Sequence, residues 1–82
     1  RLLSRGLGDV YKRQNWKSAE LDLVRSIQLD TTFGLAYGNL GVVYMNTMQD
    51  SLSFINLEKA IKYDPENPNH SANLELLKSF SQ

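Results

Sequence analysis

The feature that most constrains the fold is an internal repeat with a period of 34 residues. Five identical pairs appear when the chain is aligned with itself at this offset: Leu23 and Leu57, Ile27 and Ile61, Asp30 and Asp64, Asn39 and Asn73, and Leu40 and Leu74. Periods of about 20–50 residues are typical of stacked structural repeats. Such units bury a core only against their neighbours and present an extended concave surface. The repeat therefore predicts a binding scaffold, without identifying its partner.

Hydrophobic periodicity predicts four helices joined by short loops. They are expected at about Trp16–Leu29, Leu35–Asn46, Ser51–Tyr63 with Asp50 or Ser51 as N-cap, and from Asn67-Pro68-Asn69 onward with fraying at Ser79–Gln82. The third helix ends at Asp64-Pro65, because proline cannot continue the hydrogen-bond ladder. The breaks near Asp30–Gly34, Thr47–Asp50 and Asp64–Asn69 predict an all-α fold of antiparallel helix pairs.

Glycine stands on the apolar stripe of the second predicted helix. The stripe comprises Tyr37, Leu40, Gly41 and Tyr44. A glycine inside a helix costs about 1 kcal/mol relative to alanine. Gly41 therefore predicts that another helix crosses closely at this position, and Gly38 adds a second such cost.

The stretch Gly34–Asn67 resembles one complete tetratricopeptide repeat. The matching residues are Tyr37, Leu40, Gly41, Tyr44, Ser53, Leu57, Ala60 and Asp64-Pro65. Met48 and Asp50 depart from the turn glycine and turn aromatic of the family. Residues 15–33 resemble the second helix of an earlier repeat, and residues 68–82 the first helix of a later one. Glu75 stands there at the glycine position, which indicates a solvent-facing or loosely packed helix. The resemblance implies an α-solenoid.

The first residues require a different interpretation. Residues 4–14 resemble a translated sequencing-library adapter, so we expect residues 1–14 to be non-native and the rest to be a metagenomic fragment. The alternative is a divergent first helix, because Leu7-Gly8 and Tyr11 imitate Leu40-Gly41 and Tyr44. Eight residues separate Tyr11 from Ala19, whereas nine separate Tyr44 from Ser53, which favours the adapter.

Composition excludes several classes of partner and site. Residues 15–82 carry five basic and eight acidic side chains, a formal charge of −3, so binding to nucleic acid has no electrostatic support. Cysteine is absent, which excludes disulfides and cysteine-based metal sites. No apolar run reaches the length of a membrane span. The natural N-terminus is missing on the adapter interpretation, so localisation is open, with the cytoplasm as the default.

The resemblance implies that a peptide lies in a groove lined by the first helix of each repeat. The positions on that face are Leu35, Gly38, Asn39, Val42, Met45 and Asn46, followed by Asn69, Ala72, Asn73 and Leu76. An asparagine amide donates and accepts hydrogen bonds, which suits a peptide backbone. Alternatively, Leu35 and Val42 pack on a neighbouring helix and Asn39 belongs to the fold consensus. The basic clamp that holds chaperone tails needs lysine at position 38 and asparagine at 42, so that ligand class is disfavoured.

Catalytic side chains are sparse. His70, the only histidine, is expected at the surface or as a capping residue, and it has no second histidine or cysteine with which to form a zinc site or nucleophile–base pair. Asp64 and Glu66 flank a turn proline and are expected to be solvated. A glycine-rich phosphate loop is also lacking. We therefore predict no enzymatic activity, no metal and no cofactor.

Two functions fit the repeat. The first is an interaction scaffold that binds a protein or peptide segment, and the alternative is the substrate-recruiting arm of a larger multidomain enzyme. A helical-repeat RNA binder is a distant third because of the missing basic charge. The full reading frame discriminates the first two. Such a short array leaves a helix face uncovered, so Trp16, Leu23 and Ile27 are expected to be incompletely buried.

Overall fold

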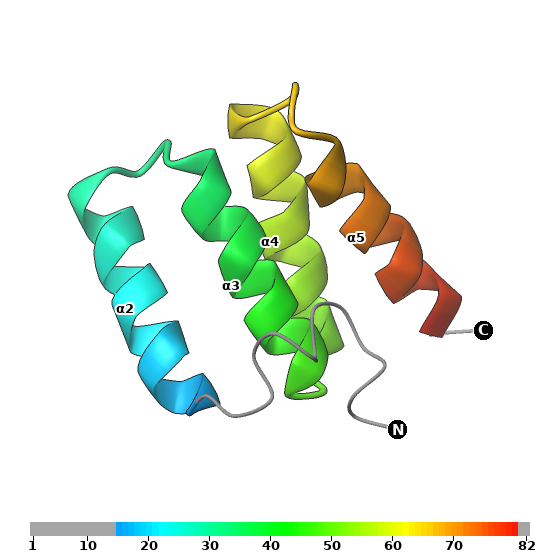
Figure 1. Cartoon of the computed structure of the whole chain (residues 1–82), viewed down its shortest axis with the longest axis horizontal. Helices are drawn as coiled ribbons and strands as arrows, with labels where there is room; N and C mark the ends of the chain where they lie inside the picture. Colours follow the sequence, from blue (N-terminus) through cyan, green and yellow to red (C-terminus); the bar gives the residue numbers. More distant parts are fainter. Residues whose placement is uncertain (1–14, 81–82) are drawn as a thin grey trace.

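The computed structural model describes residues 15–80, which form four α-helices and no strand. The helices are α2 (Trp16–Leu29), α3 (Gly34–Asn46), α4 (Asp50–Tyr63) and α5 (Pro68–Phe80). Successive helices run in opposite directions (Figure 1). The predicted all-α class and the three predicted breaks are confirmed. The adapter-like segment lies outside the described residues.

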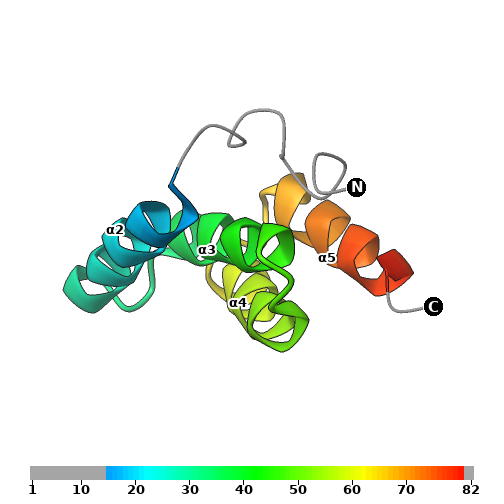
Figure 2. The same ribbon diagram turned by 90° about the horizontal axis from the view of Figure 1, so that it is seen from below.

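The central helix of the assembly is α3. It packs against α4 and α2, while α4 also packs against α5. In Figure 2, α4 lies below α3 and α5, so it forms a second layer of the assembly. Eleven of the thirteen residues of α3 are buried. A compact core joins α3, α4 and α5 and consists of Met45, Leu57, Leu74 and Leu77, with Ile61 and Leu76 packed alongside.

The predicted close crossing at Gly41 is present between α3 and α4. A Cβ added at Gly41 would lie 2.7 Å from Leu57 Cγ, so only glycine admits this approach without a shift. The hydroxyl of Ser53 donates a 2.7 Å hydrogen bond to the carbonyl oxygen of Gly41. Tyr37, Leu40 and Tyr44 are buried, as the stripe predicts. The cost of glycine in α3 is thus offset by tight packing of α4.

The first described helix, α2, is held differently. None of its residues is buried, and Trp16, Leu23 and Ile27 are half-buried, which confirms the expected incomplete cover. Two tyrosines of α3 reach toward α2 and the loop that follows it. Tyr44 donates to Glu20 Oε2 at 2.8 Å, and Tyr37 donates to the carbonyl oxygen of Thr31 at 2.9 Å. Hydrogen bonds from α3 therefore supplement the limited apolar packing between α2 and α3.

The helix ends differ in detail from the predicted ones. Helix α4 begins at Asp50 after Gln49, which makes no side-chain cap, so the predicted N-cap at Asp50 or Ser51 is wrong. Helix α3 begins one residue early, at Gly34, where a Cβ would meet Asp64. The helical hydrogen bonding of α5 continues through Phe80, past the predicted fraying at Ser79.

The turn between α3 and α4 keeps a left-handed residue although glycine is missing. Met48 has a φ of 65°, a region that costs a residue with a Cβ about 1–2 kcal/mol. The amide of Gln49 donates to the carbonyl oxygen of Tyr44 at 2.9 Å, which closes the turn. The turn is thus formed at the expense of backbone strain at Met48.

Candidate functional site

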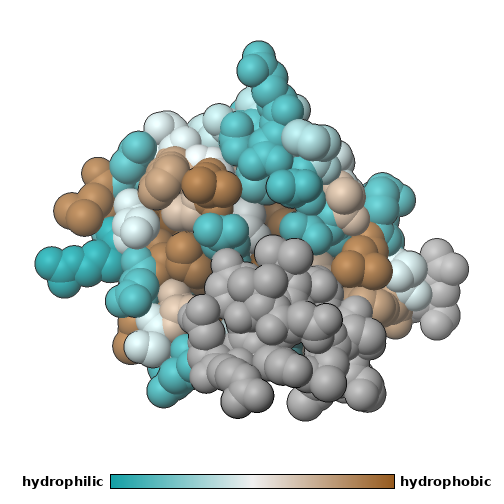
Figure 3. Space-filling view, viewed as in Figure 1, coloured by the Kyte–Doolittle hydropathy of each residue, from teal (hydrophilic) through white to brown (hydrophobic). Residues whose placement is uncertain are grey.

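A cavity of about 170 Å³ lies between the N-terminal halves of α3 and α5. Three pairs of residues line it, and each pair is separated by the repeat period: Leu35 and Asn69, Gly38 and Ala72, and Asn39 and Asn73. Val42, Asn67 and His70 complete the lining. Equivalent positions of two repeats therefore face one shared space. Figure 3 shows the molecule from the same side as Figure 1, and hydrophilic patches alternate with hydrophobic ones over the upper half of that face.

The structure brings together most, but not all, of the predicted groove residues. Leu35, Gly38, Asn39, Val42 and Asn73 meet at the cavity, although Gly38 and Val42 contribute from buried positions. Leu35 is exposed, and Asn39 and Asn73 are half-buried. The accessible side chains of the cavity are thus mainly amides and one leucine.

Met45 and Asn46 do not line this cavity. Met45 is 0% exposed and belongs to the core with Leu57. Asn46 is 6% exposed, and its Nδ2 donates to the carbonyl oxygen of Val42 at 2.9 Å. Its Oδ1 is buried without a partner among the described residues. Leu76, on the corresponding face of α5, packs beside the core.

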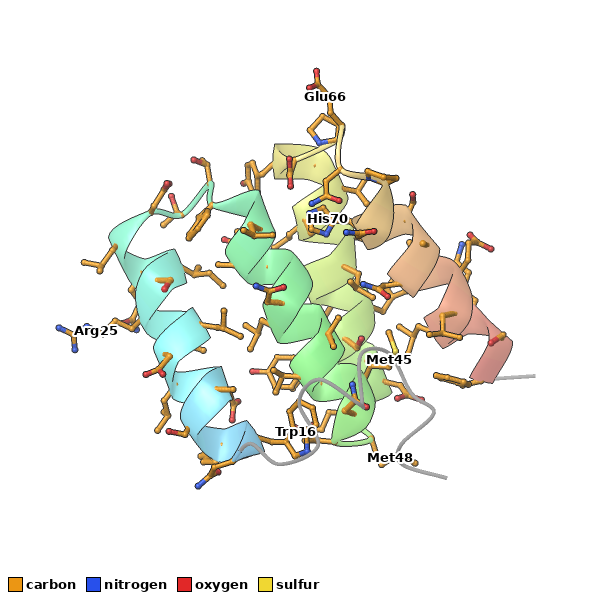
Figure 4. All side chains as sticks on the ribbon, in the orientation of Figure 1. Trp16, Arg25, Met45, Met48, Glu66 and His70 are labelled. Carbon is orange, nitrogen blue, oxygen red and sulfur yellow. The ribbon has the colours of Figure 1, made fainter. Side chains whose placement is uncertain are left out.

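His70 is the functional candidate that the sequence reasoning missed. The expected surface position is wrong, because the side chain is only 3% exposed. Its Nε2 lies 2.9 Å from Asp64 Oδ2, so Asp64 is also engaged rather than merely solvated. Figure 4 shows the imidazole between α5 and the upper end of α3.

Gly38 makes room for the imidazole. A Cβ at position 38 would collide with Cε1 and Nδ1 of His70, so the absence of a side chain on α3 admits the ring of α5. One sequence signal was available. At the repeat offset His70 aligns with Ala36, a small residue that the structure shows to be buried, so a large side chain stands where the preceding repeat has a small one. The glycine and the histidine together form a fitted contact.

Charged groups stay away from the cavity lining. Two lysines of α4 lie instead over tyrosine rings: Lys59 Nζ is 5.6 Å from the ring centre of Tyr37, and Lys62 Nζ is 5.2 Å from that of Tyr63. The two tyrosine rings stack at 5.6 Å. Asp64 reaches the site only through His70. The cavity is therefore a neutral, amide-rich environment.

Two other hollows occur on the described part of the molecule. One, of about 240 Å³, lies between the start of α2 and the end of α3 and includes Trp16 and Gln49. The larger, of about 470 Å³, lies between α4 and α5 and includes Phe54 and Leu77. Neither unites residues related by the repeat, so the α3–α5 cavity is the stronger candidate despite its smaller volume.

No family model matches the chain, and neither a curated protein nor a solved structure matches it. Within residues 15–80, no group of three or more histidine, cysteine or acidic side chains is arranged to hold a metal ion. None of the four described helices combines the length and apolar character that crossing a bilayer requires.

Proposed function

We propose that residues 15–80 are part of a tetratricopeptide-type scaffold that binds a protein or peptide segment in the groove between α3 and α5. The observation that carries this proposal is the cavity lined by three residue pairs at the 34-residue offset. A solenoid repeats its ligand-facing positions along one surface. A continuous ligand-binding surface of this kind requires equivalent residues of successive repeats to line the same groove, as the three pairs do.

The accessible chemistry suits an extended peptide. The side chains of Asn39 and Asn73 form no hydrogen bond to the described residues, so their amides are available to donate to and accept from a peptide backbone. Leu35 adds exposed apolar surface at the rim. The volume of about 170 Å³ is below the roughly 300–1,000 Å³ of small-molecule pockets. It suits one side chain of a longer segment better than a cofactor.

Selection from a random peptide library against the full chain tests the proposal. A selected peptide should perturb the nuclear magnetic resonance signals of Gly38, Asn39 and Asn73 on titration. Asn39→Arg should weaken its binding by about tenfold or more, since a bulky charge would enter the groove. Gln28→Arg adds the same charge at an exposed position of α2 and should leave binding unchanged.

Two results would contradict the proposal. The selection could return no binder under conditions in which circular dichroism shows the helices intact. Alternatively, the selected peptides could perturb α4 or α2 and leave the α3–α5 cavity unaffected.

A further inference from the structure

The cavity offers hydrogen-bond donors and acceptors in similar numbers. The amides of Asn39 and Asn73 each present both kinds of group. Asn67 uses its Oδ1 to accept from the backbone N–H of Asn69 at 3.0 Å, which leaves its amino group as a donor. A ligand that satisfies such a lining must itself both donate and accept.

His70 supplies an additional acceptor. Asp64 Oδ2 is an acceptor, so the hydrogen of the Nε2···Oδ2 contact is carried by His70 Nε2. In the neutral imidazole, Nδ1 then has a free lone pair. The Nδ1–Cε1 edge lies over Gly38, and both residues border the cavity. Asp64 thereby orients the neutral ring with its acceptor nitrogen beside Gly38, where both residues border the cavity.

The same lining disfavours charged ligand groups. A carboxylate cannot donate to Nδ1 of the neutral ring, finds no lysine or arginine in the lining, and would approach the carboxylate of Asp64 behind the ring. The N-terminal turns of α3 and α5 favour acceptors, but this effect is small beside the cost of burying an unpaired charge. An ammonium group only donates and meets no carboxylate in the lining.

We infer that the cavity selects an uncharged primary carboxamide, the side chain of glutamine or asparagine, from the bound segment. The carboxamide nitrogen donates to His70 Nδ1 or an asparagine oxygen, and its oxygen accepts from the amino groups of Asn39, Asn67 or Asn73. The apolar walls formed by Leu35, Val42 and Ala72 cover the methylene groups. This inference rests on the proposed peptide groove and adds its side-chain specificity.

The test uses four mixtures of short peptides blocked at both ends. One central position is fixed as Gln, Glu, Lys or Leu, and the flanking positions hold the same mixture of neutral residues. Each mixture is titrated into the full 82-residue chain at neutral pH, and the backbone signals of Gly38 and Asn73 are followed. We expect the Gln mixture to half-saturate these signals at a concentration about tenfold below that of the Glu mixture.

Charge substitutions then test whether the cavity itself makes the distinction. Asn73→Lys introduces a cation into the lining at a half-buried position and should reverse the preference from Gln to Glu. Asn39→Lys should do the same from the opposite wall, which keeps the test valid if one variant folds poorly. Gln28→Lys carries the same added charge outside the cavity and should keep the Gln preference.

The outcomes separate the inference from the proposed function. Equal binding of the Gln, Glu and Leu mixtures at the cavity would overturn carboxamide selection while supporting a peptide groove. A Gln preference unaffected by both cavity lysines would place the selective contact elsewhere and also overturn it. Failure of every mixture to perturb the cavity would contradict both.

Discussion

The imidazole of His70 occupies the space that a side chain at Gly38 would fill, although the two residues are 32 positions apart. The ring is held there by its hydrogen bond to Asp64. One contact thus joins α3, the end of α4 and α5. Its strength can be measured because either partner can be changed alone.

Gly38→Ala should destabilise the chain by about 1–2 kcal/mol. The methyl group gains about 1 kcal/mol of helix propensity, but overpacking costs about 1–3 kcal/mol and the displaced ring loses its bond to Asp64. In a His70→Ala background the collision is absent, so the same substitution should stabilise by up to about 1 kcal/mol. Urea denaturation of the parent, the two single variants and the double variant gives the coupling energy. Additive effects would contradict the fitted contact.

The helices could be predicted because their signals are local. The Asp64-Pro65 stop and the stripe containing Gly41 each depend on residues close in sequence. The site was harder, since α3 is buried on nearly all sides. The apolar positions of α3 therefore do not distinguish groove residues from core residues. Met45 was predicted to line the groove but lies in the core. The burial of His70 depends on Gly38 of α3 and on Asp64 after α4, and the alignment with Ala36 at the repeat offset does not show either partner.

Met48→Gly should raise the free energy of unfolding by about 0.5–1 kcal/mol. Glycine removes the Cβ strain of about 1–2 kcal/mol at a φ of 65°, and the greater entropy of the unfolded chain offsets part of the gain. Met48→Ala is the matched control, because it loses the same side chain but keeps the Cβ. Chemical denaturation should rank glycine above both the parent and alanine. An alanine variant as stable as the glycine variant would assign the gain to side-chain loss.

Two positions related by the repeat should differ in their response to alanine. Gly41→Ala should cost about 1–3 kcal/mol, because the new methyl group meets Leu57. Glu75, the equivalent residue of α5, is exposed and pairs weakly with Lys78 at 3.5 Å. Glu75→Ala should therefore change stability by less than about 0.5 kcal/mol. Thermal melts of both variants test the difference, and similar losses would show that the Glu75 side chain stabilises α5 more than its exposure and weak pairing indicate.

The bond between Tyr44 and Glu20 predicts pH dependence at both extremes. Burial, followed by the carboxylate of Glu20, raises the pKa of Tyr44 from 10.0 to about 12. The hydroxyl of Tyr44 is the main cause that lowers the pKa of Glu20 below 4.5. The stability supplied by Tyr44 is complete below pH 10 and is lost between pH 10 and about 12. The stability supplied by Glu20 is present above pH 4.5 and is lost as the pH falls through its lowered pKa.

Tyr44→Phe should lower stability at neutral pH by about 1 kcal/mol and flatten its decline above pH 10. Tyr63→Phe is the control, since the ring still stacks on Tyr37 and its hydroxyl forms no hydrogen bond with the described residues. Denaturation midpoints across the pH range compare the two variants. Parallel pH profiles for Tyr44→Phe and the parent would show that the bond does not contribute.

The absence of any buried residue in α2 has a consequence for how the sequence can vary. Tyr44 of α3 binds Glu20 of α2, and Tyr37 of α3 binds Thr31 in the loop that follows α2, so the orientation of α2 depends in part on the sequence of its neighbour. In a saturation mutagenesis scan, α2 should accept most substitutions that preserve helicity and Glu20. Helix α3 should accept few, because almost every residue is enclosed. Evolutionary drift would then accumulate in one helix while the angle between the two stays constant.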